Sequence, residues 1–137
     1  MSQDIDLEIK VIKRVVVKEK QDRYIQFISK SKNRHKFIDD LPHFKDFNWT
    51  LFEKIDGNAG TQIIATLKKN RIDNKLCYVI SENKDIDTKT ITSTEAIREI
   101  DGYRSGTILV FGEAEIIFYE GESMKESYLS KLLFDRS

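Results

Sequence analysis

The sequence contains one cysteine and no long apolar run, and each shortage excludes a class of protein. Cys77 alone cannot form an internal disulfide, which fits a reducing compartment. No apolar stretch approaches the roughly 20 residues of a membrane-spanning helix. The first residues include Asp4 and Asp6, where a signal peptide would have basic and apolar regions. We therefore expect a soluble cytoplasmic protein that has no membrane association.

The composition is that of a folded protein with a rather high share of polar residues. Of the 137 residues, 39% are hydrophobic and 34% are charged, and 8 Phe, 5 Tyr and 1 Trp supply large side chains for a core. This length suits one hydrophobic core and is too short for two good ones. We expect a single globular domain over residues 1–137, with no internal repeat.

The net charge is zero, but charge is distributed unevenly along the chain. Residues 1–36 carry 10 basic and 5 acidic side chains, a charge of +5, whereas residues 82–137 carry 7 basic and 12 acidic side chains, a charge of −5. This split argues against polyanion binding by the whole molecule, so nucleic acid is not the favoured partner. It leaves open a local basic patch, head-to-tail self-association, or two solvated faces.

Hydrophobic spacing predicts helices in the first half of the chain. Residues 5–17 fit both the strand period and a helical stripe, and the β-branched Val15, Val16 and Val17 slightly favour a strand. A helix is expected from about Lys20, then a second short helix that ends before Pro42. Thr61 is expected to cap a further short helix that closes near residue 70.

The second half alternates strands and helices. Thr92 and Glu95 form a capping-box pattern at the start of a predicted helix. Gly112 and Glu113 suit a two-residue hairpin turn. The expected elements are a strand at 76–80, a helix at 93–101, a central strand at 107–111, a strand at 115–119 and a terminal helix at 123–133. The fold class is therefore α+β, with a helical N-terminal half, a strand–helix–hairpin sheet unit and a C-terminal helix.

Polar residues follow the predicted strand 76–80 and form the first candidate site. Ser81 and Glu82 are the candidate catalytic residues, and Asp85 and Asp87 are candidate ligand-binding residues. Loops that leave strand ends are common places for ligands. The alternative is a solvated turn whose side chains bond their own backbone. A calcium loop is disfavoured, because Thr88 stands where such a loop needs glycine.

A basic segment forms the second candidate site. Residues 30–36 precede a predicted helix and include Lys32, Arg34, His35 and Lys36. Cations oppose the dipole at a helix start, so an anion among them would be stabilising. Free backbone N–H groups together with Lys and Arg would bind a phosphate or carboxylate. The alternative is a solvated charged turn.

Other chemistry has little support in the sequence. Cys77 lies within a strand, where a cysteine is usually an inert hydrophobe. No nucleophile elbow, phosphate-binding glycine loop or dinucleotide motif is present. Asp39, Asp40, His43 and Asp46 are of types that bind metals, but they lack the spacing of a zinc motif. We expect no metal and no cofactor.

Several short motifs carry a resemblance. They are residues 77–82 (Cys-Tyr-Val-Ile-Ser-Glu), 106–108 (Gly-Thr-Ile), 119–122 (Tyr-Glu-Gly-Glu), Arg23-Tyr24, Lys36-Phe37 and the turn Phe44-Lys45-Asp46. With them, residues 18–129 resemble a family of small uncharacterised bacterial cytosolic proteins. The chain departs from that family at 110–118, where Val-Phe-Gly-Glu-Ala-Glu-Ile-Ile-Phe replaces a Cys-Ile-Pro-Gly type of turn. The resemblance implies a bacterial cytosolic origin and a role for Ser81, Glu82 and Glu120, without implying a reaction.

The sequence favours a non-catalytic binding or protein-interaction module of the immunity-like or regulatory kind. Its partner would be another protein or a small anionic ligand. The alternative is a small hydrolytic enzyme or anionic-ligand-binding protein with a site at the end of strand 76–80. In that alternative Glu82 is the general base and Arg34 or His35 holds the substrate, with Glu120 nearby. The oligomeric state is left open.

Overall fold

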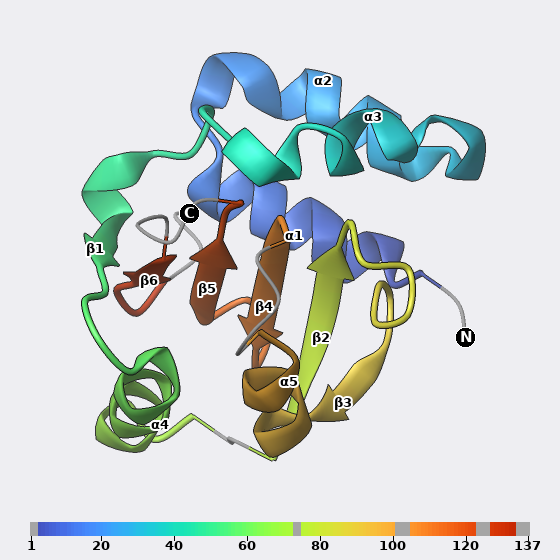
Figure 1. Ribbon diagram of the computed structural model, residues 1–137. Helices are drawn as coiled ribbons and strands as arrows, with labels where there is room; N and C mark the ends of the chain where they lie inside the picture. The colour runs from blue at the N-terminus through green and yellow to red at the C-terminus, as the bar shows by residue number, and fades with distance from the viewer. Residues whose placement is uncertain (1–2, 73–74, 101–104, 123–126, 134–137) are drawn as a thin grey trace.

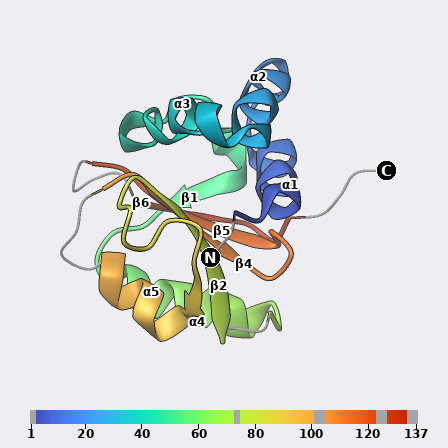
Figure 2. The ribbon, with the colours of Figure 1, turned by 90° about the vertical axis from the view of Figure 1, so that its right-hand side faces the viewer.

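The computed structural model describes residues 3–72, 75–100, 105–122 and 127–133, which form three layers (Figures 1 and 2). The helices are α1 (Ile5–Val15), α2 (Lys18–Ser29), α3 (His35–Ile38), α4 (Ala59–Lys69) and α5 (Ser93–Ile100), with 3-10 turns η1 (Ser31–Asn33), η2 (Leu41–His43) and η3 (Trp49–Leu51). The strands are β1 (Phe52–Lys54), β2 (Leu76–Ser81), β3 (Thr90–Thr92), β4 (Thr107–Phe111), β5 (Ile116–Glu120) and β6 (Ser127–Ser130).

The strands form one antiparallel sheet in the order β1-β6-β5-β4-β2-β3. Helices α1–α3 lie on one face of the sheet, and α4 and α5 lie on the other (Figure 2). The predicted α+β class is confirmed. No helix in the described ranges is both long and apolar enough to cross a bilayer.

Two hydrophobic cores lie on the two faces of the sheet. Strand β4 shows the division, because Ile108 packs with α1–α3 while its neighbour Leu109 packs with α4 and α5. All five residues of β4 are buried, which confirms the central position predicted from its apolar sequence. Tyr78 and Val110 continue the first core, and Phe118 continues the second.

The slight preference for a strand at residues 5–17 is wrong, because Ile5–Val15 form helix α1. The side chain of Asp4 caps the helix by accepting a hydrogen bond from the Leu7 N–H at 3.1 Å. The buried residues Glu8, Val11, Ile12 and Val15 have the 3.6-residue spacing of one helical face. Ile5, Leu7 and Ile9 alternate with charged residues, as in a strand. One of these charged residues, Glu8, is nevertheless buried on the helical face that contacts the core.

The terminal helix predicted at 123–133 is also wrong over its described part, where Ser127–Ser130 form strand β6. Adjacent residues of β6 serve opposite faces of the sheet: Tyr128 packs against the core below α1–α3, and Leu129 belongs to the other core. A strand places neighbouring side chains on opposite faces, whereas one helical stripe cannot. Residue 124, Gly102 and Tyr103 of the predicted helices lie outside the described residues.

The turn between β4 and β5 is longer than the predicted two-residue hairpin. Phe111 and Ile116 form the last cross-strand pair, so residues 112–115 make the connection. Gly112 has φ +63°, as expected for a glycine that begins a tight turn, and Ala114 also has a positive φ of 59°. The N–H of Glu115 closes the turn by donating to the carbonyl of Phe111.

Gly106, at the start of β4, allows the first helical layer to touch the sheet backbone. A Cβ atom at this position would lie 2.5 Å from the backbone atoms of Leu41 and Pro42. The hydroxyl of Tyr119 on β5 reinforces the contact by donating to the carbonyl of Leu41. Turn η2 is therefore fixed directly onto the end of the sheet.

Candidate functional site

Arg34 joins the two segments that the sequence marks as candidate sites. Its side chain lies between α1, where it meets Glu8, and the loop after β2, where it meets Asp87. Nε and Nη2 donate to the Glu8 carboxylate at 3.1 and 2.8 Å. Nη1 and Nη2 donate to the Asp87 carboxylate, the latter at 2.9 Å. Four of the five guanidinium N–H groups are thus occupied by carboxylates of the chain itself.

Glu8 is completely buried, and every partner it has is a hydrogen-bond donor. Besides Arg34, the Tyr78 hydroxyl donates to it at 2.7 Å and the Gln3 side-chain amide donates at 2.7 Å. The Tyr78 oxygen also accepts the Asp4 N–H at 3.0 Å. A buried carboxylate without such partners would cost several kcal/mol, so these contacts make the burial tolerable.

The environment keeps Arg34 and Tyr78 protonated. Burial by itself lowers the pKa of Arg34, but the hydrogen bonds to Asp87 and Glu8 outweigh it and raise the pKa above the usual value. Burial raises the pKa of Tyr78; the hydrogen bond from the Asp4 backbone opposes this rise, and the bond to Glu8 adds to it. Both groups therefore act as fixed donors at neutral pH.

The loop after β2 is organised by its own side chains. The Ser81 N–H donates to the Asp87 carboxylate at 3.0 Å, and the Asn83 N–H donates to the Ser81 hydroxyl at 3.0 Å. The Asp85 N–H donates to the Asn83 side chain at 3.0 Å. The loop is therefore a turn whose side chains bond its own backbone, which is the alternative that the sequence left open for this segment. Asp85 is exposed, whereas Asp87 belongs to the Arg34 cluster.

Ser81 and Glu120 lie in one row across the sheet. Ser81 pairs with Thr107, and Thr107 pairs with Glu120 on the next strand. The Ser81 and Thr107 hydroxyls share a hydrogen bond of 2.8 Å and are both buried. Because β4 separates their strands, Ser81 and Glu120 are two strand spacings apart, roughly 10 Å.

Glu82 is exposed and bonds the neighbouring strand end. Its backbone N–H donates to the Gly106 carbonyl at 3.0 Å, and its carboxylate accepts the Gly106 N–H at 2.7 Å. These bonds extend the β2–β4 pairing by one residue. Glu82 thus lies at the end of the β2–β4 pair, where it bonds both backbone groups of Gly106.

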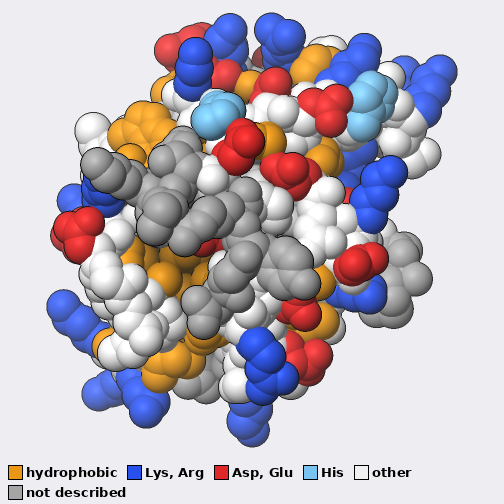
Figure 3. All heavy atoms as spheres, viewed as in Figure 1, with side chains coloured by type: hydrophobic (Ala, Val, Ile, Leu, Met, Phe, Trp, Pro, Cys, Tyr) orange, Lys and Arg blue, Asp and Glu red, His pale blue; other side chains and the backbone are white. Residues whose placement is uncertain are grey.

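The other basic candidates lie on the surface. Lys32, His35 and Lys36 are exposed, and Lys and Arg side chains gather along the upper rim over α2 and α3 in Figure 3. The Lys36 ammonium lies 5.5 Å from the Phe27 ring centroid, within cation–π range. The Nδ1 of His35 contacts the Lys32 carbonyl at 3.0 Å. Arg34 alone points inward from this segment.

The described residues bring together few groups with catalytic chemistry. His43 is exposed and its Nε2 lies 2.9 Å from the Glu122 carboxylate. Burial raises the pKa of Cys77 from 9.0 to about 12, so the thiolate is scarce at neutral pH. Within the described ranges, no three His, Cys, Asp or Glu side chains are grouped to hold a metal ion.

Sequence reasoning missed Glu8 and Tyr78, which complete the Arg34 cluster. One signal was available for Glu8: it stands at the helical spacing of Val11, Ile12 and Val15, so a charged residue occupies an apolar stripe. A charge in that position requires a buried partner. The identity of the partner depends on contacts between segments far apart in the chain.

A partly apolar surface remains open beside α1. Two adjoining hollows of about 250 and 600 Å³ share Tyr78 and Thr90, neighbours on β2 and β3. Leu76 beside the first hollow is 54% exposed, and Ile5 beside the second is 38% exposed. We name this the β2–β3 surface; its members are Gln3, Asp4, Ile5, Asp6, Leu7, Leu76, Cys77, Tyr78, Thr88, Thr90, Val110 and Gly112.

Comparison with protein-family models, with curated proteins and with solved structures finds no match to this chain.

Proposed function

We propose that the protein is a non-catalytic interaction module that binds a basic, partly apolar segment of another protein on the β2–β3 surface. The observation that carries this proposal is the exposure of Leu76 and Ile5 around one pair of hollows. Among the described residues, the large hydrophobic side chains that are at least 38% exposed are Ile5, Trp49 and Leu76. Two of the three belong to this surface.

Covering these side chains would supply binding energy. Full burial of a leucine or isoleucine is worth about 1.5–3 kcal/mol, so the exposed halves of Leu76 and Ile5 together offer roughly 2 kcal/mol. Tyr78 provides a rigid base, because its hydroxyl is fixed by Glu8 and Asp4. Apolar anchors on a rigid base are typical of the centre of a protein interface.

Charge selects the kind of partner. The residues that line the two hollows include Asp4 and Asp6, and no Lys or Arg is among them. Carboxylates beside an apolar surface attract a basic segment and repel an acidic one. A symmetric dimer through this surface would bring the carboxylates of two copies together, so a different protein is the better partner.

The alternative of a small hydrolytic enzyme has weaker support. Arg34 already holds two internal carboxylates, and the Nδ1 of His35 contacts the Lys32 carbonyl. A general base needs a nucleophile or water within hydrogen-bond reach. An immunity-like or regulatory module, which acts by occupying its partner, needs no such group.

The test compares proteins recovered from the native host with wild type and three variants. We expect Leu76→Ser and Ile5→Ser to reduce recovery of one specific polypeptide with a basic segment at least tenfold. Trp49→Ser, an equally exposed apolar residue elsewhere, is the matched control and should retain it. A synthetic peptide of that segment should bind more weakly as salt rises. Equal recovery with all four proteins would refute the proposal.

A further inference from the structure

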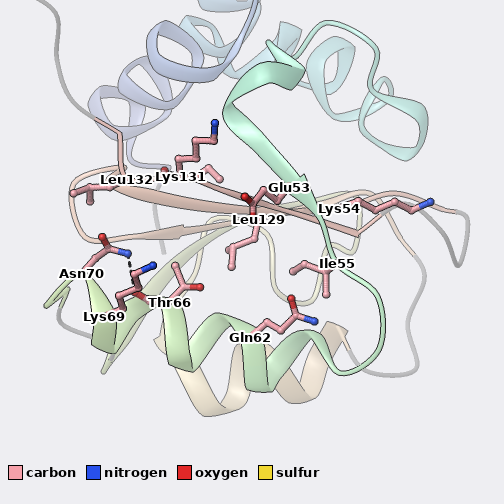
Figure 4. A pocket seen from close by; sticks show the side chains of 11 residues that line it. Glu53, Lys54, Ile55, Gln62, Thr66, Lys69, Asn70, Leu129, Lys131 and Leu132 are labelled. Atoms are coloured by element: carbon pink, nitrogen blue, oxygen red, sulfur yellow. Dashed lines mark hydrogen bonds between the residues drawn. The ribbon is translucent and has the colours of Figure 1, made fainter.

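The two outer strands of the sheet differ in how well their free edges are protected. β1 is at one end of the strand order and β3 is at the other, so each has one edge that pairs with no described strand. In β1, Glu53 and Lys54 are charged and exposed, and both line the cavity between β1 and α4 that Figure 4 shows. Charged side chains on an edge strand discourage pairing with another chain.

Strand β3 has no such charge. Its residues are Thr90, Ile91 and Thr92, all β-branched and at least partly exposed, and such residues favour an extended chain. Figure 1 shows β3 at the right-hand end of the sheet, with its outer side turned away from the other described strands. β3 is therefore the edge at which the sheet is better able to accept another strand.

The hydrogen bonds to β2 indicate which backbone groups of β3 are free. The Val79 N–H donates to the Lys89 carbonyl at 2.9 Å. Alternate residues of an antiparallel strand bond to the same neighbour, so Ile91, two residues later, also bonds to β2. Thr90 therefore directs its N–H and its carbonyl toward the open edge, and Thr92 directs its N–H there.

This free edge is short. Before it, the Thr88 N–H donates to the Val79 carbonyl at 2.8 Å, so two residues of the chain oppose one residue of β2 and form a bulge. After it, helix α5 begins at Ser93. The three free backbone groups of Thr90 and Thr92 suit a short extended segment of another chain.

The free edge adjoins the β2–β3 surface. Thr90 lines both hollows, and it pairs with Tyr78 on the face of the sheet that α1 covers. Asp4 and Asp6 line the second hollow together with Thr90. Ile91 packs against the core on the other face. A strand added to this edge places alternate side chains beside the two carboxylates and beside Ile91.

We infer that the partner segment binds as an added β-strand along the free edge of β3. This inference rests on the proposed function, because the segment is the same basic, partly apolar one. Its backbone bonds to Thr90 and Thr92, and these main-chain bonds supply affinity. Its long side chains on one face extend over these two small residues toward Leu76, Asp4 and Asp6, which supplies specificity.

The test uses the synthetic peptide acetyl-Lys-Val-Leu-Val-Lys-Val-Lys-amide, which has lysine and leucine on one face of a strand and valine on the other. Isothermal titration calorimetry should show that Thr90→Pro binds it at least tenfold more weakly than wild type, because proline has no N–H. Thr90→Val keeps the N–H, so it is the matched control and should bind as wild type does. Circular dichroism should show a native fold for both variants, since proline is tolerated where an edge strand faces solvent.

Two measurements on the wild type test the pairing without any substitution. Two further forms of the peptide carry N-methyl groups on alternate residues, one form on the lysines and leucine and the other on the valines. A strand turns alternate N–H groups to its two sides, so only one of these forms should bind. Amide hydrogen exchange followed by NMR should slow at least tenfold at Thr90 when the unmethylated peptide binds, and should change less at Ile91, which already bonds to β2.

Each outcome separates the inference from the proposed function. Absence of peptide binding at millimolar concentration would overturn the inference, as would equal binding of the two methylated forms or unchanged exchange at Thr90. Leu76→Ser in the same titration tests the surface itself. If Leu76→Ser weakens binding and Thr90→Pro does not, the surface stands and the strand pairing is wrong. If only Thr90→Pro weakens binding, the pairing stands and the proposed surface is wrong.

Discussion

The two faces of the sheet differ in the kinds of polar side chain that they bury. Below α1–α3, the core includes Glu8 and Arg34, the charged residues that are buried in the described chain. Below α4 and α5, the core side chains of Ile63 and Leu67 are apolar, and the buried polar neighbours Ser81 and Thr107 are uncharged. The first layer thus adds directional charge pairs to its apolar core, whereas the second is held mainly by shape and apolar contact.

This difference predicts how each layer responds to damage. A directional cluster fails when one member is lost, because the remaining charges stay buried without partners. An apolar core loses energy in proportion to the volume removed. Four experiments test this difference between the two layers, in order of decreasing effect on stability.

Arg34→Met should have the largest effect. It leaves the Glu8 and Asp87 carboxylates without their shared cation, and we expect the free energy of unfolding to fall by about 3–5 kcal/mol. Urea unfolding followed by circular dichroism measures it. The triple variant Glu8→Gln, Arg34→Met, Asp87→Asn removes all three charges and should recover at least half of that loss. A single variant that loses less than about 1 kcal/mol would contradict the directional description.

Ile108→Ala and Leu109→Ala compare the apolar parts of the two faces at adjacent positions of β4. Both side chains are fully buried, one on each face. Each substitution should lower the free energy of unfolding by about 2–5 kcal/mol, and the two values should agree within about 1.5 kcal/mol. The same urea titration measures both. A much smaller loss for Ile108→Ala would mean that the charge cluster, and not packing, supports the first face.

Alkaline pH should weaken the fold through Cys77, which lies on the α4–α5 face. Its pKa is raised by burial from 9.0 to about 12. The thiol of the unfolded chain ionises above about pH 9 while the folded thiol stays protonated, so stability is complete below pH 9 and is lost as pH rises toward 12. The slope should be about 1.4 kcal/mol for each pH unit. Urea titrations at several pH values measure it.

Cys77→Val is the matched variant for that experiment. It keeps a small buried hydrophobe and removes the ionisable group, so its stability should fall less steeply between pH 9 and 10. Above about pH 10 both proteins should still lose stability, because burial also raises the pKa of Tyr78 on the other face. Identical slopes for wild type and Cys77→Val from pH 9 to 10 would show that the thiol does not control this loss.

Helix capping should give the smallest difference. Asp4 caps α1, and Asn58 caps α4 by accepting the Thr61 N–H at 3.0 Å. Asp4→Ala and Asn58→Ala should each cost about 1 kcal/mol, because both remove one bond at a helix start. Thermal unfolding can compare them. A loss at Asp4 that is several-fold larger would indicate that the cap also supports the Glu8 cluster.

The parts of the fold that could be predicted depend on local patterns. Strand β4 was recognisable from four consecutive apolar residues, Ile108–Phe111, and α5 from Thr92, whose hydroxyl does accept the Glu95 N–H at 3.1 Å. Strands β1 and β3 have three residues each, too few to show a period of two. They form because β1 pairs with β6 and β3 pairs with β2, and these pairings depend on the tertiary fold.

The candidate site was harder to predict for the same reason. Arg34 was singled out as a cation at a helix start, but its partners Glu8 and Asp87 are 26 and 53 residues away in the sequence. No periodicity links positions so far apart. The prediction that an anion would lie among the basic residues therefore remains a prediction for Lys32, His35 and Lys36, while Arg34 itself is occupied by internal carboxylates.

The pairing of β1 with β6 has a consequence for how the protein is made. A ribosome releases the chain from its N-terminus, so α1, α2 and β1 emerge long before Ser127–Ser130 are synthesised. Until then β1 lacks the strand with which it pairs. The pairing of these two strands therefore has a high contact order, and we expect it to be a late step in folding.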